Sequence, residues 1–195
     1  MKTDYDVTVV GLGPAGTLTS LLLSDSSVNV IGIDKEKDIY NLPRAVTIDD
    51  EGLRILQRLN LEHIYLNNAT AIEGAYFLDD KLKKLSGIDI PSGHLTGNGW
   101  MPTMLFHQPY TDALLREELV KSTCSVKLET ELVDLIPKEN HYIVKTQNLT
   151  NGTEDSFSTQ YVVGADGASS KVRNIMEFDQ EDLDYDKNWL VVDVK

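Results

Sequence analysis

The chain has few of the residues on which several common classes of protein depend. It contains one cysteine, Cys124, so no internal disulfide can form and a cytoplasmic location is expected. No recognisable base accompanies Cys124, so we interpret it as a small structural residue near a helix end and not as a nucleophile. The four histidines are scattered without the spacing of metal ligands, and no metal site is expected.

Basic residues are also scarce. The 195 residues include 18 Lys and Arg against 31 Asp and Glu, which gives a net charge of −13. An acidic chain of this kind lacks the electrostatic footprint of a nucleic-acid binder and is disfavoured at anionic membrane surfaces. No apolar run approaches the ~18 residues that suggest a transmembrane helix. The polar, acidic start of the chain does not have the form of a signal peptide. Neither a nucleic acid nor a membrane is therefore expected as a partner.

Six residues near the amino end organise the rest of the chain. An apolar run at residues 7–10 leads into Gly-Leu-Gly-Pro-Ala-Gly at residues 11–16, and a helical pattern follows. A second apolar run at residues 28–33 ends in Asp34. This order of strand, glycine turn, helix, strand and acid is the βαβ fingerprint of a dinucleotide-binding fold.

Each position of this glycine loop has a physical reason. Gly11 permits a sharp exit from the strand, Gly13 lets a pyrophosphate approach the backbone, and Gly16 lets the helix pack close to the strand. Pro14 suits the first helical turn, where its missing N–H costs nothing. The free N–H groups at this helix end favour an anion. Asp34 is placed to accept hydrogen bonds from a ribose diol, and its charge would repel the 2′-phosphate of NADP.

The remaining pattern predicts an α/β fold with a central parallel sheet. Helices are expected at residues 14–24, 49–59, 109–121 and 172–176, and strands at 5–10, 28–33, 72–78, 104–107, 126–128, 130–136, 141–146 and 161–164. The alternating strands between 130 and 146 predict an accessory antiparallel meander that covers one face of the larger sheet. Residues 61–103 are expected to form a loop or lid insertion, rich in glycine and proline from 87 to 102.

Open α/β sheets bind ligands beyond the carboxyl ends of their strands. Gln108 stands at such a strand-to-helix junction, and Asp166–Gly167 follows the buried strand at 161–164. Arg44 is a fork-shaped donor suited to phosphate, although its local context alone favours a solvated loop charge. His107 is expected to be packed and not catalytic, because no partner acid is evident.

Together these segments resemble the single-component FAD-dependent aromatic hydroxylases, and within them the 3-(3-hydroxyphenyl)propionate hydroxylase branch. The resemblance runs from about residue 5 to the end of the chain. Its motifs are Gly-Leu-Gly-Pro-Ala-Gly at 11–16 with Asp34, Leu-Pro-Arg-Ala-Val at 42–46 with Ile-Asp-Asp-Glu at 48–51, Phe-His-Gln-Pro at 106–109, Val-Gly-Ala-Asp-Gly-Ala-Ser-Ser at 163–170 with Val172 and Arg173, and Trp-Leu-Val-Val-Asp at 189–193. Many flavoproteins share the glycine motif alone, whereas the Asp-Gly turn and the Leu-Pro-Arg-Ala stretch are more specific.

The resemblance implies a Rossmann-like FAD-binding domain over residues 1–180 and the truncated start of a substrate-binding domain over 181–195. The strand expected at 189–194 would be the first of that domain and would present an unpaired edge. Catalytic residues are not assigned. The implied cofactor-binding residues are Gly11, Gly13, Pro14, Ala15, Gly16, Asp34, Lys35, Arg44, Gln108, Asp166 and Gly167.

The resemblance also implies a role for each part of this site. The glycine loop at 11–16 would hold the FAD pyrophosphate, and Asp34 would bind the adenosine ribose. Arg44 would contact the cofactor near its phosphates or ribityl chain, which reverses the interpretation from local context. Gln108 would hydrogen-bond FAD from the start of its helix. Asp166 would belong to a turn that serves both FAD and NAD(P)H.

The reaction implied by the resemblance begins when NAD(P)H reduces the flavin by hydride transfer. Oxygen then adds at the flavin C4a, and the hydroperoxide hydroxylates a small phenolic substrate, as in aromatic compound catabolism. Family members are much longer, and a later Gly-Asp segment completes their flavin site. We therefore expect this chain to be an amino-terminal portion with little or no hydroxylase activity alone, compatible with a homodimer. Two alternatives stay open: another flavoprotein such as a reductase or epoxidase, and a non-catalytic FAD- or NAD-binding fragment.

Overall fold

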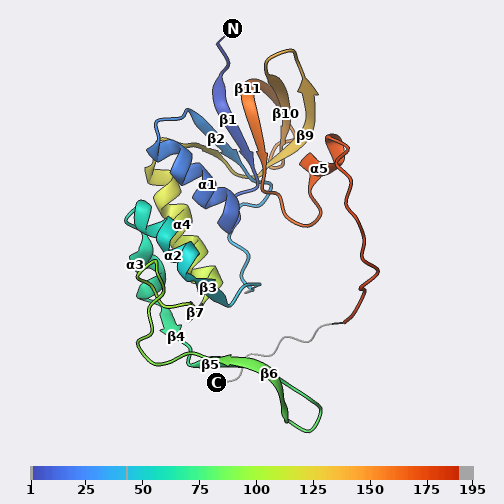
Figure 1. Ribbon diagram of the computed structural model, residues 1–195. Helices are drawn as coiled ribbons and strands as arrows, with labels where there is room; N and C mark the ends of the chain where they lie inside the picture. Colours follow the sequence, from blue (N-terminus) through green and yellow to red (C-terminus); the bar gives the residue numbers. More distant parts are fainter. Residues whose placement is uncertain (1, 43, 189–195) are drawn as a thin grey trace.

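A computed structural model describes residues 2–42 and 44–188 of the chain (Figure 1). Its largest sheet contains β1 (Tyr5–Val10), β2 (Val30–Ile33), β8 (Ser125–Lys127), β9 (Thr130–Pro137), β10 (Tyr142–Asn148) and β11 (Glu154–Gly164). These strands lie in the order β8-β2-β1-β11-β10-β9. The pairs among β8, β2, β1 and β11 are parallel, and those among β11, β10 and β9 are antiparallel. The predicted α/β class, with a central parallel sheet and an antiparallel meander, is confirmed.

The antiparallel meander continues the sheet beyond the parallel strands, and it also covers one face of these strands. Residues 159–164 of β11 pair with β1, whereas residues 154–159 pair with β10. One hydrophobic core joins the meander to side chains of β1 and β2. Its buried members are Val10, Ile31, Ile33, Leu132, Leu135, Val144, Phe157 and Val172. The meander therefore covers one face of the parallel strands, as its alternating pattern predicted.

Helices cover the opposite face of these strands (Figure 1). They are α1 (Pro14–Asp25) and α4 (Gln108–Lys121), which contact each other. Val9 and Val30 point to this side and share a core with Leu115 and Leu119 of α4, all fully buried. Because β1 and β2 are buried on both faces, their sequences are continuous apolar runs without alternation.

A smaller sheet lies beyond α4, in the order β3-β7-β4. Its strands are β3 (Thr47–Asp49), β7 (Thr103–Phe106) and β4 (Ala69–Ala71), and it is accompanied by α2 (Asp50–Arg58) and α3 (Glu62–Leu66). Only β7 and α2 were expected from the sequence. β3 and β4 are three residues long, which is too short to show a strand period, and they form by pairing with β7.

The stretch at 61–103 is more regular than the predicted loop or lid. It includes the hairpin of β5 (Gly74–Leu78) and β6 (Lys84–Asp89), which stands apart from the large sheet in Figure 1. The glycine-rich loop was expected from residue 87, but Gly87 lies within β6 at a φ of +153°. A Cβ there would come within 2.4 Å of the Ala75 carbonyl oxygen, so only glycine fits this strand position.

The carboxyl end of the described chain is irregular after the short helix α5 (Lys171–Ile175). The strand expected at 189–194 lies outside the described residues. The division between a domain at 1–180 and another at 181–195 stays a prediction. Within residues 2–42 and 44–188, no helix has the length and apolar character needed to cross a membrane.

Candidate functional site

The glycine loop connects β1 to α1 through two close backbone approaches. Gly11 has a φ of +89°, and a Cβ on it would lie 2.5 Å from the Ala165 carbonyl oxygen. A Cβ on Gly16 would lie only 1.8 Å from the Gly11 carbonyl oxygen. Larger residues are excluded at both positions, for the reasons that the sequence pattern predicted.

Gly13 is free of such contacts and faces open space. A Cβ on it would meet nothing within 4 Å. It immediately precedes α1, which starts with Pro14 and Ala15. The first N–H groups of a helix have no partner within the helix, and the helix dipole makes this end positive. The loop is therefore an open cradle of backbone donors, and it fits an anionic group such as a pyrophosphate.

Asp34 joins the end of β2 to this cradle. Its Oδ2 accepts a hydrogen bond from the Leu12 backbone N–H at 2.7 Å, and its Oδ1 accepts one from the Glu36 N–H at 2.9 Å. The side chain is 13% exposed. An ionised carboxylate has about four lone-pair sites, so Asp34 can still accept hydrogen bonds from a ribose diol while it holds the loop. Lys35, the next residue, is exposed, and its cofactor role stays a prediction.

Arg116 of α4 also reaches the glycine loop, although the sequence pattern did not single it out. Its Nη2 donates to the Leu12 carbonyl oxygen at 2.6 Å and lies 3.6 Å from Asp34 Oδ2. Burial lowers the pKa of Arg116, while the charges of Asp34 and Asp112 raise it. One available signal was the spacing of Gln108, Asp112 and Arg116, which places three polar residues on one helical face.

Gln108 and Asp112 continue this polar line towards the start of α4. Gln108 Oε1 accepts hydrogen bonds from the backbone N–H groups of Arg44 and Ala45, each at 2.7 Å, and its Nε2 donates to Asp112 Oδ2 at 3.1 Å. Burial raises the pKa of Asp112 to about 6, although the Gln108 hydrogen bond and the Arg116 charge act to lower it. The structure thus brings together Arg44 and Gln108, which are 64 residues apart.

Arg44 is held by its backbone, while its side chain lies at the surface. The guanidinium carbon lies 4.1 Å from the centroid of the Tyr40 ring, in a cation–π contact. The sequence-based interpretation from local context was a solvated charge, and the exposed side chain fits it. The anchored backbone fits the alternative, an arginine kept ready for a ligand. Its contact with the cofactor stays a prediction.

The Asp166–Gly167 turn lies beside the glycine loop, because β1 and β11 are parallel neighbours. Asp166 itself is engaged within the turn: Oδ1 accepts from Ser170 Oγ at 2.6 Å, and Oδ2 accepts from the N–H groups of Lys171 and Val172. Burial acts to raise the pKa of Asp166, but these hydrogen bonds outweigh it and hold the pKa below its usual range.

The part of this turn that is open to a ligand is its backbone. Gly167 has a φ of +81°, and a Cβ on it would meet nothing within 4 Å. Both carboxylate oxygens of Asp166 already accept hydrogen bonds at the start of α5. We therefore assign the Asp166 side chain to shaping the turn, while its cofactor role stays a prediction.

Other candidates from the sequence lie away from this site. Cys124 is 8% exposed and burial raises the pKa of its thiol, as expected of a structural residue. His107 was expected to be packed, but it is exposed at the start of α4. The alternation of β7 explains this error: Leu105 and His107 face outward, while Met104 is buried. Within the described part of the chain, no group of three or more His, Cys, Asp or Glu residues could hold a metal ion.

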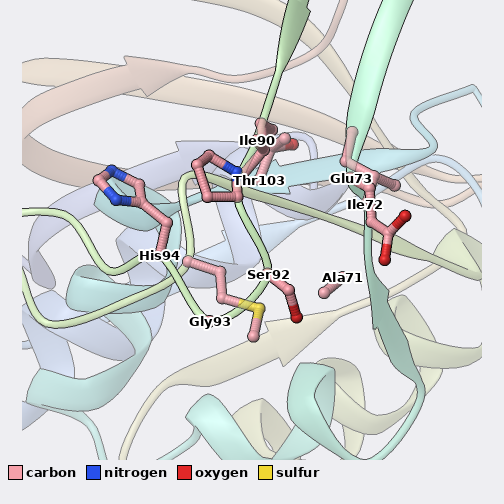
Figure 2. Close-up of a pocket in the computed structure, with 10 residues that line it drawn as sticks. Ala71, Ile72, Glu73, Ile90, Ser92, Gly93, His94 and Thr103 are labelled. Carbon is pink, nitrogen blue, oxygen red and sulfur yellow. The ribbon is translucent and has the colours of Figure 1, made fainter.

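A separate cavity of about 100 Å³ lies where the β5–β6 hairpin meets the segment before β7. Figure 2 shows Glu73, Ser92 and His94 around it. None of its lining residues belongs to the glycine loop, to α4 or to the Asp166–Gly167 turn. This cavity is therefore separate from the candidate site at the glycine loop.

Comparisons with known proteins agree with this geometry. A family model described as "FAD binding domain" matches residues 4–195. The probable NADH-specific resorcinol 4-hydroxylase of Rhodococcus jostii is 29% identical over 192 residues, which are 96% of this chain and 35% of that protein. The 3-(3-hydroxy-phenyl)propionate/3-hydroxycinnamic acid hydroxylase of Mycolicibacterium gilvum is 30% identical over 200 residues, 99% of this chain and 33% of that protein. The chain spans about a third of the length of these curated relatives.

Solved structures show the same fold. The flavin-dependent monooxygenase PieE, in complex with FAD and substrate, superposes with a TM-score of 0.76 at 21% identity, covering 90% of this chain and 33% of that one. The p-nitrophenol 4-monooxygenase PnpA from Pseudomonas putida DLL-E4 has a TM-score of 0.77 at 22% identity, covering 90% of this chain and 44% of that one.

Proposed function

The chain belongs to the FAD binding domain family, and from this premise we propose that it forms the cofactor-binding part of an NAD(P)H-dependent monooxygenase acting on a small phenolic compound. The names of the curated relatives support the reaction class, since both are hydroxylases of phenolic compounds. Because the chain spans about a third of their length, hydroxylation and the phenolic substrate are proposed for the whole protein. A cytoplasmic location and a homodimer also remain proposals.

One observation carries this proposal. The open backbone cradle at Gly13, the carboxylate of Asp34 and the Asp166–Gly167 turn converge at the carboxyl ends of β1, β2 and β11. Open α/β sheets bind their ligands at this edge. The donors of the cradle and the acceptor of Asp34 match an anionic pyrophosphate next to a ribose diol, as found in a dinucleotide.

We assign the binding roles as follows from the contacts of each residue. The N–H groups at the start of α1 would hold the pyrophosphate, with Asp34 at the adenosine ribose and exposed Lys35 beside it. Gln108 would keep the Arg44 loop in place, so that Arg44 can reach the phosphates or the ribityl chain. The Gly167 backbone would flank the cofactor. FAD, when bound, supplies the redox and oxygen chemistry, while the residues of this chain bind it and orient it.

The absorbance spectrum of the purified chain tests this proposal. The chain is incubated with FAD, separated from free cofactor on a desalting column, and scanned from 300 to 550 nm. We expect a yellow protein with flavin bands and one FAD per chain. A folded chain that stays colourless after this treatment but binds NAD would overturn the proposal in favour of a nicotinamide-binding module.

A further inference from the structure

Arg116 has more hydrogen-bond donors than partners. A guanidinium carries five N–H donors and cannot lose its charge in a protein. The side chain is 12% exposed, yet its Nε and Nη1 atoms are buried and have no partner among the described residues. Burying such a group is costly unless it is paired. Its two close contacts, both through Nη2, are with Leu12 and Asp34.

Hydrogen bonds fix both the N–H and the carbonyl group of Leu12. The Leu12 N–H donates to Asp34 Oδ2, and the Leu12 carbonyl oxygen accepts from Arg116 Nη2 at 2.6 Å and from Thr17 Oγ1 at 2.9 Å. Asp34 Oδ2 therefore lies between the Leu12 N–H and the guanidinium. A carboxylate held from two directions has little freedom to rotate, and its unused lone pairs keep one orientation.

We infer that Arg116 is a positioning residue for the adenosine end of the cofactor site, acting through Asp34 and the Leu12 carbonyl. It holds the Asp34 carboxylate in the orientation that accepts hydrogen bonds from the ribose 2′- and 3′-hydroxyls. Both contacts run through Nη2 of a guanidinium that stays charged when it is buried, whereas the pKa of a buried lysine shifts readily. The inference rests on the proposed function, because it assigns a ribose to Asp34.

The ribose contact can be isolated with two small probes. ADP and 2′-deoxy-ADP share the adenine and the pyrophosphate and differ in one hydroxyl. Their affinities are measured by isothermal titration for the wild-type chain, Arg116→Met and Arg116→Lys. Lys121→Met is the matched control, because Lys121 lies on the same helix but pairs with Glu118 at the surface. Melting curves and circular dichroism identify the variants that fold.

We expect wild type to prefer ADP by about tenfold, the effect of one hydrogen bond to a charged group. Arg116→Met should lose most of this preference, Arg116→Lys should keep part of it, and Lys121→Met should match wild type. Should Arg116→Met fail to fold, the partial loss in Arg116→Lys carries the test.

Two results would overturn the inference in different ways. If folded Arg116 variants weaken both nucleotides equally and keep the wild-type preference, Arg116 is a packing residue and the proposed function stands. If the folded wild-type chain binds neither nucleotide nor FAD, the proposed function fails and the inference fails with it.

Discussion

The Asp34 carboxylate accepts a hydrogen bond from the Leu12 backbone N–H at 2.7 Å, so the acid that the sequence assigns to a ribose also holds the glycine loop. The two residues belong to the same βαβ unit, Asp34 at the end of β2 and Leu12 in the turn after β1. One side chain therefore contributes to both the fold and the binding site, and its removal should affect both.

Asp34→Ala should lower the stability of the chain and its affinity for FAD. The variant leaves the buried Leu12 N–H without its acceptor, which costs about 1–3 kcal/mol, and removes the carboxylate proposed to bind the ribose. Urea unfolding and FAD titration measure the two effects. Asp38→Ala removes an exposed acid from the same loop and should change neither. A variant at Asp34 as stable as wild type would contradict the double role.

Two glycine-to-alanine substitutions should have different consequences. Gly16→Ala places a Cβ 1.8 Å from the Gly11 carbonyl oxygen, so we expect a loss of several kcal/mol or no folded protein. Gly13→Ala places its Cβ in open space and should fold, with stability changed by less than about 1 kcal/mol. Because that methyl group occupies the cradle, FAD binding should still fall by about tenfold or more. Thermal melting followed by FAD titration separates the two effects.

The Gln108 side chain should control the order of the Arg44 loop. Gln108→Leu removes the acceptor shared by the Arg44 and Ala45 N–H groups, so local opening should become easier. We expect trypsin to cut after Arg44 about fivefold faster, the effect of ~1 kcal/mol, when the fragments are followed by mass spectrometry. Gln57→Leu removes a different glutamine, one that binds Trp100, and should leave this cut unchanged. Equal cutting rates in all three proteins would show that Gln108 does not order the loop.

Asp112 should make stability depend on pH in the acid range. Its folded pKa of about 6 lies above the ordinary 3.8, so folding favours the protonated carboxyl. This contribution is fully present below about pH 4 and is lost as the pH rises through about 6. Asp112→Asn stays neutral and can still accept from Gln108, so it should be more stable than wild type by about 1–2 kcal/mol at pH 7.5. The advantage should vanish near pH 4.

Urea unfolding at a series of pH values measures this difference. Asp155→Asn is a control whose effect on stability should have the opposite sign, because the hydrogen bond from Lys127 lowers the pKa of Asp155. That variant should lose stability at neutral pH. If Asp112→Asn is instead less stable than wild type at pH 7.5, the Arg116 charge outweighs the cost of burying the Asp112 carboxylate, and burial does not raise the pKa of Asp112.

The glycine loop could be predicted from the sequence because its requirements are local. The close approaches of Gly11 and Gly16 and the helical start at Pro14 recur wherever a strand turns sharply into a helix. Gln108 could be singled out for the same reason, since it precedes Pro109 at a junction between a strand and a helix, and its hydrogen bond to FAD stays a prediction. The apolar runs of β1 and β2 likewise predicted the buried parallel strands at the centre of the sheet.

The contact of Arg116 with the glycine loop could not be predicted in this way. Its main partner is the Leu12 backbone carbonyl, 104 residues away, and a carbonyl oxygen gives no sign in the sequence of what it binds. The strands β3 and β4 were missed because their pairing with β7, and not a periodic pattern, makes them strands. The use of Asp166 at the start of α5 was also missed, because the residue types of the turn fit a ligand contact and a helix cap equally well.

We propose that this chain binds FAD through the adenosine end of the cofactor. The most direct measurement is a titration of FAD and of FMN, which lacks the adenosine part, with the purified chain, followed by flavin fluorescence. We predict saturation at one FAD per chain, with FMN bound at least about a hundredfold more weakly because the ribose and pyrophosphate contacts are lost. Equal affinities for FAD and FMN, or no change in the fluorescence of either flavin with a folded chain, would rule out binding through the adenosine end.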